Sequence, residues 1–94
     1  MQVGQVVISL SGHDKGEYFI VTKVDKEYLF LADGKTRQID RPKKKKEKHV
    51  QKTNYIAKDI QEKIENALGV SNADLREAVE NYKNNNQGGD DLGK

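Results

Sequence analysis

The 94-residue sequence contains no cysteine, no tryptophan and a single proline, and its aromatic residues are four tyrosines and two phenylalanines. Without cysteine the chain forms neither disulfides nor thiolate zinc sites, so we expect a fold held by packing alone and no oxidising compartment. The longest uninterrupted apolar run is Tyr28 to Ala32. A secretory signal needs about 7 to 15 apolar residues in a row and a membrane span about 20. We therefore expect a cytoplasmic protein that does not engage a membrane.

Apolar residues are also scarce, at 34% of the chain, and they are unevenly spread. Residues 1–41 contain 17 of them and residues 54–83 contain 13, whereas residues 42–53 contain only Val50. A chain of this length supports one small core. The two apolar-rich segments must therefore share it.

Charge follows the same division. The net charge of +2 arises from residues 1–53, with 12 Lys and Arg against 7 Asp and Glu, and from residues 54–94, with 5 against 8. These counts give +5 and −3. Nine basic residues lie between Lys35 and Lys52, opposed only by Asp40 and Glu47. One sector of a nearly neutral molecule should therefore attract polyanions.

The first half of the chain reads as short strands joined by turns. Val6, Ile8 and Leu10 alternate with their neighbours, which is the period of a strand with one buried face. Residues 11–16 have the composition of a hairpin loop that needs positive φ, and Asp33-Gly34 is typical of a type I′ turn. Four strands are expected, over residues 5–10, 17–25, 27–32 and 36–39. We predict a small, curved antiparallel barrel with a second apolar face that needs a cover.

The C-terminal half is the candidate for that cover. Ile56, Ile60, Ile64 and Leu68 recur every four residues, as on one face of a helix. Thr53 or Asn54 is the expected N-cap of this helix, and Gly69 the expected left-handed residue at its end.

A second helix is expected from Ser71 onward. Ser71 is the predicted N-cap, and Asp74 stands at the third helical position, close to the capping-box pattern. Leu75, Val79 and Tyr82 then share one helical face. The domain organisation expected is a barrel with a basic tail over residues 1–53, a two-helix extension over 54–83 and a disordered tail over 84–94.

The strongest local feature is the basic segment from Arg41 to His49, which contains four consecutive lysines. Consecutive lysines repel one another, so we expect this segment to stay extended until a polyanion neutralises it, with Pro42 ending the fourth strand before it. Lys35, Arg37 and Lys15 are expected to join it in one basic rim. Lysine contacts phosphates as a point charge and does not read bases. Basic runs also act as localisation signals or solubilising linkers.

Other candidate sites are weaker. Tyr18 and Tyr28 could stack on unpaired bases, although alternating tyrosines in strands more often belong to the core. The loop from Gly12 to Gly16 lacks the spacing and the Lys-Ser/Thr pair of a nucleotide-binding P-loop. His13 has no second histidine nearby for a metal site, and no nucleophile elbow or group of converging acids is recognisable. We expect no enzyme, metal or cofactor.

Three blocks of the sequence, in the same order, resemble a known family. Gly4 to Ser9 and Gly12 to Gly16, followed by an apolar strand, are similar to the KOW motif. With Ala32 to Arg37 and Arg41 to His49, the sequence over residues 3–54 resembles the eukaryotic-type large-subunit ribosomal proteins (families fourteen, six and twenty-seven) and their small stand-alone bacterial relatives. The chain has Tyr18-Phe19 where many generic KOW motifs have another glycine, which favours the ribosomal branch over KOW domains of transcription factors.

This resemblance implies an SH3-like barrel that binds structured RNA, often ribosomal RNA. It also implies which residues would contact the RNA. The expected RNA-facing loop consists of Gly12, His13, Asp14, Lys15 and Gly16. The expected phosphate-binding strand and tail consist of Lys35, Arg37, Arg41, Lys43, Lys44, Lys45, Lys46, Lys48 and His49.

The sequence thus predicts a mainly β fold with C-terminal α, namely an SH3-like antiparallel barrel followed by a two-helix hairpin. The predicted function is non-catalytic RNA binding in ribosome structure, assembly or translation. Ribosomal or assembly proteins are possible partners of the helices. The alternative is a protein-interaction adaptor whose barrel or helical hairpin binds a transcription or translation factor.

Overall fold

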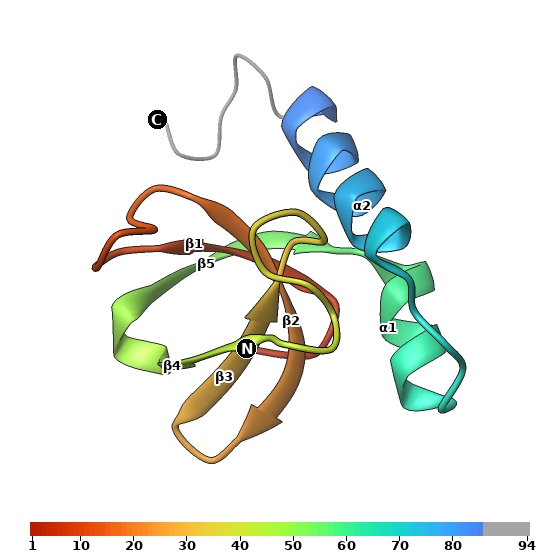
Figure 1. The fold of residues 1–94 in the computed structure, drawn as a ribbon, viewed down its shortest axis with the longest axis horizontal. Coiled ribbons are helices and arrows are strands. Elements are labelled where there is room, and N and C mark those ends of the chain that lie inside the picture. Colours follow the sequence, from red (N-terminus) through yellow and green to blue (C-terminus); the bar gives the residue numbers. More distant parts are fainter. Residues whose placement is uncertain (86–94) are drawn as a thin grey trace.

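The structure of the chain is a computed structural model that describes residues 1–85 (Figure 1). It is mainly β, with two α-helices at the C-terminal end. The strands are β1 (Gln5–Ser9), β2 (Tyr18–Asp25), β3 (Tyr28–Ala32), β4 (Lys43–Lys46) and β5 (Val50–Ile56). The helices are the 3₁₀ turn η1 (Glu47–His49), α1 (Lys58–Glu65) and α2 (Asn72–Asn85). Of the tail expected over residues 84–94, the first two residues belong to α2 and the others lie outside the described residues.

The strands form one antiparallel sheet in the order β4-β3-β2-β1-β5. Irregularities between Gln5 and Val7 and between Val21 and Lys23 interrupt the register, and such bulges bend and twist a sheet. The sheet is nevertheless not closed into a barrel, contrary to the expectation. β4 and β5 are the two edge strands of the sheet. η1 connects them along the chain, but they do not form a hydrogen-bonded pair with each other.

The fourth strand is not where the sequence pattern placed it. Residues 36–39 form a loop, and the lysine run itself is β4, with Lys43 opposite Leu31 and Lys46 opposite Tyr28. The reason is Asp33, whose Oδ1 accepts hydrogen bonds from the backbone N–H groups of Lys35 (2.9 Å) and Arg37 (2.8 Å). These bonds turn the chain into a loop over residues 33–42 in place of a two-residue hairpin turn, and pairing with β3 resumes only after Pro42.

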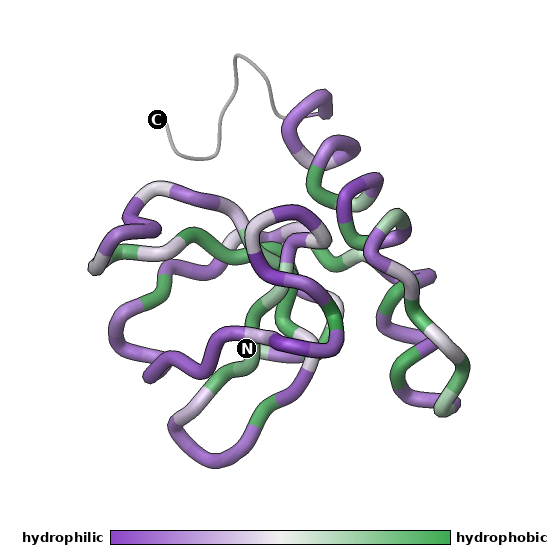
Figure 2. The backbone as a smooth tube through the Cα atoms, in the orientation of Figure 1, coloured by the Kyte–Doolittle hydropathy of each residue, from purple (hydrophilic) through white to green (hydrophobic). Residues whose placement is uncertain are grey.

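Two apolar clusters lie on the two faces of the sheet. The inner cluster consists of Val7, Phe19, Val21, Leu29, Leu31 and Val50. The outer cluster joins the sheet to the helices and consists of Val6, Ile20, Ala32, Ala57, Ile60, Leu75, Ala78, Val79 and Tyr82. The prediction that the C-terminal half covers the second apolar face is therefore confirmed. Figure 2 shows apolar segments of both helices turned toward the sheet.

The first helix is shorter than its four-residue apolar repeat suggested. Ile56 ends β5, the helix begins at Lys58 after Ala57, and no side chain caps it, so the expected caps Thr53 and Asn54 belong to the strand. Ala67 has the left-handed φ of 57° expected of Gly69, and Leu68 is 59% exposed. Residues four positions apart, such as Ile56 and Ile60, lie on one face of either a strand or a helix, so the spacing did not show where β5 ends. β5 therefore continues past residue 53, where the boundary between the barrel and the helices was expected.

The second helix agrees with the sequence pattern. Ser71 Oγ accepts a hydrogen bond from the N–H of Asp74 (3.1 Å), and the carboxylate of Asp74 accepts one from the N–H of Ser71 (3.0 Å). This reciprocal capping box satisfies two backbone donors at the start of the helix. The face with Leu75, Val79 and Tyr82 is buried, as predicted.

The N-terminal turn of α2 is fastened to the loop over residues 33–42. Arg76 Nη1 donates to the carbonyl of Gly34 (2.7 Å), and Asn72 Oδ1 accepts from the N–H of Ile39 (2.8 Å). Gly34 has φ +77°, and a Cβ at this position would overlap the carbonyl oxygen of Asn72. The loop therefore depends on glycine both for its backbone conformation and for its close approach to the helix.

Candidate nucleic-acid interface

The loop between β1 and β2 contains the first group of predicted RNA-facing residues. Gly12 and Gly16 have φ of +85° and +88°, which fits the expectation of a loop with positive φ. The loop is closed by hydrogen bonds from the N–H of Gly16 to Ser9 O (2.8 Å) and from the N–H of Glu17 to Asp14 O (2.9 Å). His13 and Lys15 are exposed at its tip, whereas Asp14 is largely buried.

Asp14 is the centre of a charged cluster that fixes this loop. Its Oδ2 lies 2.8 Å from Lys43 Nζ, and its Oδ1 lies 3.0 Å from Lys45 Nζ and accepts a hydrogen bond from Ser9 Oγ at 2.7 Å. Lys45 Nζ also donates to Ser9 Oγ (2.9 Å) and to the carbonyl of Ser11 (2.7 Å). The carboxylate thus ties β4 to the β1–β2 loop, 29 and 31 positions away in sequence from its two lysine partners.

The pKa of Asp14 reflects this setting. Burial raises the pKa of the carboxyl, but hydrogen bonds from Lys43, Ser9 and Lys45 outweigh it and hold the pKa well below the ordinary value of 3.8. The carboxylate is therefore charged throughout the physiological range. Since its charge is already neutralised by two cations, we assign Asp14 to shaping the loop.

Alternation along β4 gives the four lysines two different environments. Lys43 and Lys45 lie opposite Leu31 and Leu29 on the inner face, where the side chain of Lys45 is only 8% exposed. Lys44 and Lys46 lie opposite Phe30 and Tyr28 on the outer face. The segment expected to be an extended basic tail is extended, but as a strand paired with β3, and two of its four lysines are engaged inside the protein.

The other predicted basic residues are exposed. Among residues 1–85, none of them forms an ion pair with a carboxylate. With the two histidines that accompany them they make up what we call the basic arc: His13, Lys15, Lys35, Arg37, Arg41, Lys48 and His49. These residues come from loops and from η1, so Arg37 does not lie on the strand that was expected over residues 36–39.

Several observations connect the parts of the basic arc. Arg37 and His13 line one shallow hollow of about 330 Å³, and Arg37 and Arg41 line the next. The N–H of Leu10 donates to the carbonyl of His49 (2.9 Å), which places η1 beside the start of the β1–β2 loop. Figure 1 shows this loop and η1 at the side of the sheet away from α1 and α2. The arc therefore runs from the loop beside α2 to the far end of the sheet.

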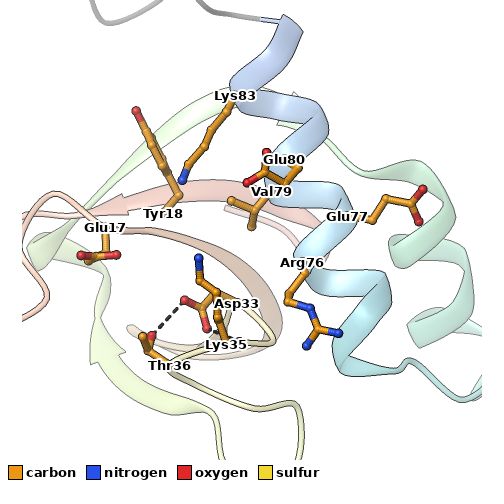
Figure 3. Close-up of a pocket in the computed structure, with 10 residues that line it drawn as sticks. All are labelled: Glu17, Tyr18, Asp33, Lys35, Thr36, Arg76, Glu77, Val79, Glu80 and Lys83. Carbon is orange, nitrogen blue, oxygen red and sulfur yellow. Dashed lines mark hydrogen bonds between the residues drawn. The ribbon is translucent and has the colours of Figure 1, made fainter.

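A groove of about 420 Å³ lies between α2 and the loop over residues 33–37 (Figure 3). Its lining has both signs of charge: Glu17, Asp33, Lys35, Arg76, Glu77, Glu80 and Lys83, together with Tyr18, Thr36 and Val79. Tyr18 packs edge-on against Tyr82 at 5.6 Å between ring centres and has Lys83 Nζ 5.3 Å from its own ring centre. Tyr18 is therefore partly in the core. The four carboxylates of the lining repel a polyanion, so this groove is unsuited to binding one.

Two further features of the described residues concern metal ions and membranes. Within residues 1–85, no group of three or more His, Asp or Glu side chains is placed to hold a metal ion. No helix in the same range is long and apolar enough to cross a membrane.

Some residues of the site were missed by the sequence pattern. Ser9 and Ser11 accept hydrogen bonds from the buried Lys45 and orient it. In the sequence, only their position beside the glycine loop indicated that they could belong to the site. Lys23 and Phe30 lie on the outer face with Lys44, with Lys23 Nζ 5.3 Å from the centre of the phenyl ring. The pairing of Lys23 with Phe30 follows a bulge, which strand alternation alone does not show.

Comparison with known proteins adds no family to these observations: no protein-family model matches the chain, and no curated protein matches it.

Proposed function

We propose that this chain is a non-catalytic RNA-binding protein that holds structured RNA, with ribosomal RNA the foremost candidate, in ribosome structure, assembly or translation. The observation that carries the proposal is the basic arc, whose lysine and arginine side chains are exposed and form no ion pair with a carboxylate among the described residues. The free-energy cost of binding phosphates is small for such cations, because no internal ion pair has to be broken first.

The strand arrangement and the resemblance of the sequence support the same proposal. A five-stranded antiparallel sheet with a 3₁₀ turn between its last two strands is compatible with an SH3-like fold of the KOW type. The loop with Gly12 and Gly16 and the loop with Arg37 and Arg41 lie next to one another, as an RNA-facing surface of that type requires. Binding by lysine and arginine at loop tips is expected to follow RNA shape and charge more than base sequence.

The salt dependence of binding tests this proposal. If the exposed Lys15, Lys35, Arg37, Arg41, Lys44 and Lys48 each neutralise one phosphate, the logarithm of the binding constant should fall with the logarithm of salt concentration with a slope of roughly −4 to −5. Fluorescence anisotropy with a labelled ribosomal RNA hairpin measures this slope. A slope near zero would exclude the mechanism.

A matched pair of variants locates the contacts. Arg37→Gln/Arg41→Gln should weaken binding and make the slope less steep by roughly 1.4 to 1.8, since each lost phosphate contact removes about 0.7 to 0.9. Lys58→Gln/Lys83→Gln removes the same charge from the exposed surface of the helices and should leave the slope unchanged. Equal effects of the two variants would mean that only net charge matters and that the basic arc is not the site.

One observation favours the adaptor as a second candidate. The lining of the groove beside α2 includes Glu77, Glu80, Val79 and Tyr18, which suits a basic and partly apolar protein segment better than RNA. Under this hypothesis Glu77→Lys/Glu80→Lys should abolish capture of a translation or transcription factor and leave RNA binding intact. Co-purification of the factor with the wild-type protein but not with the variant is the measurement.

A further inference from the structure

The outer face of β3 extends beyond the helices that cover its end. Leu29 and Leu31 belong to the inner cluster, so Tyr28, Phe30 and Ala32 face outward. Ala32 is buried in the outer cluster beneath the helices, whereas Tyr28 and Phe30 are partly exposed. Figure 1 shows the β2–β3 hairpin projecting away from α1 and α2. Two aromatic side chains therefore stand on a part of the sheet that the helices leave uncovered.

Lysines surround these two rings. Lys44 Nζ lies 4.5 Å from the ring centre of Tyr28 and 5.9 Å from that of Phe30. Lys46 Nζ lies 5.9 Å from the ring centre of Tyr28, and Lys23 Nζ lies 5.3 Å from that of Phe30. Each distance is within the range of about 6 Å at which a ring face attracts a cation.

Strand pairing explains why these residues gather. Phe30 lies opposite Lys44 on β4 and opposite Lys23 on β2, whereas Tyr28 lies opposite Lys46 on β4 and opposite Asp25 on β2. Paired residues project from the same face of a sheet. The aromatic–lysine face, as we call Lys23, Tyr28, Phe30, Lys44 and Lys46, thus has two rings along its middle strand. Lysines flank Phe30 on both sides, and Tyr28 has a lysine on one side and Asp25 on the other.

We infer that the aromatic–lysine face binds unpaired nucleotides of the RNA; this inference rests on the proposed function and adds to it a specific RNA feature. Bases stack on aromatic rings whatever their identity, while lysines beside the rings neutralise the backbone phosphates. Tyr28 and Phe30 are two residues apart, or about 7 Å along a strand. That is roughly twice the 3.4 Å rise per base of a nucleic-acid strand, so nucleotides can stack against both rings in succession.

The charge of this face favours RNA over a protein. Three lysines surround the rings, and two carboxylates lie at the Tyr28 end: Glu27, 3.7 Å from Lys46 Nζ, and Asp25, which pairs with Tyr28. Lys44 and Lys23 are exposed and form no ion pair within residues 1–85. An apolar protein segment would leave these ammonium groups without counter-charges, whereas a single-stranded RNA supplies one phosphate for every base.

The test compares two RNA probes. One is a blunt hairpin of about one helical turn, and the other is the same hairpin with a single-stranded extension of about six nucleotides that contains 2-aminopurine. The wild-type protein should bind the extended hairpin more tightly, with quenching of the 2-aminopurine as it stacks. Tyr28→Leu/Phe30→Leu keeps apolar volume but removes both rings. It should reduce affinity for the extended hairpin by roughly five- to 140-fold per ring engaged while leaving blunt-hairpin affinity unchanged.

Circular dichroism and the thermal midpoint establish that the double variant is folded, and Lys44→Gln provides a second variant that keeps both rings. Lys44→Gln should weaken binding of the extended hairpin more than that of the blunt one. If the wild-type protein binds both hairpins equally, or if the double variant keeps the wild-type preference and quenching, the inference is wrong and the proposed function stands. If neither hairpin is bound at low salt, the proposed function fails and the inference fails with it.

Discussion

The two faces of β4 give identical residues different roles. On the inner face, Lys43 and Lys45 hold the carboxylate of Asp14 at 2.8 and 3.0 Å. On the outer face, Lys44 and Lys46 lie over aromatic rings, and Lys44 is exposed. A run of four lysines therefore contains two that position a loop and two that can meet a ligand. Replacing the whole run with neutral residues would confuse loss of binding with loss of structure.

The largest expected effect comes from removing the partner that the inner lysines share. Asp14→Asn leaves Lys45, whose side chain is 8% exposed, without a counter-charge. Breaking a fully buried pair costs about 3 to 5 kcal/mol, and because the carboxylate of Asp14 is 15% exposed we expect about 2 to 3 kcal/mol less free energy of unfolding. Urea denaturation followed by circular dichroism measures it. Asp25→Asn, at an exposed site, is the control and should change stability by less than about 0.5 kcal/mol.

A smaller effect should separate neighbouring lysines. Lys45→Gln removes the ammonium group that binds Ser9, Ser11 and Asp14, and should lower the free energy of unfolding by about 1 to 2 kcal/mol. Lys44→Gln should change it by less than about 0.5 kcal/mol but should make the salt slope of RNA binding less steep by about 0.7 to 0.9. Equal stability losses for the two variants would contradict the assignment of separate roles.

The smallest expected effect is on the stability of the protein at acidic pH. The pKa of Asp14 is lower in the folded protein than its ordinary value of 3.8, so its contribution to stability is complete above that value and is lost as the pH falls toward the folded pKa. Between pH 5 and pH 2, roughly, the wild-type protein should lose more stability than Asp14→Asn, which lacks this group. Parallel urea midpoints across that interval would show instead that Asp14 is not charged in its cluster.

Much of the fold could be predicted because it depends on local patterns. The first three strands, the capping box of Ser71 and Asp74, and the buried face of α2 all follow from alternation, helical spacing or capping chemistry. The fourth strand could not be placed, because four identical lysines have no apolar alternation to read. Its position depends on pairing with β3 and on the carboxylate of Asp14, both of which are tertiary contacts.

The candidate site divides in the same way. Exposed cations such as Lys15, Arg37 and Arg41 could be named from the sequence, because loops rich in basic residues are seldom buried. The burial of Lys45 and the partners of Asp14 could not be named, since they depend on which way each strand residue faces. Phe30 was also missed as a surface residue, because an apolar strand of five residues does not show where its covering helices end.

The attachment of α2 to the loop over residues 33–42 has a thermodynamic consequence. Arg76 and Asn72 bond the backbone of the loop that displays Lys35, Arg37 and Arg41. Any partner that shifted the first turn of α2 would also release that loop. The loop would then lose more conformational entropy when RNA binds it. By linkage, RNA bound at the loop would oppose such a partner by the same free energy. Under the proposed function, α2 and the basic loop would therefore form one coupled system, in which RNA and a partner of the helix would regulate one another without touching.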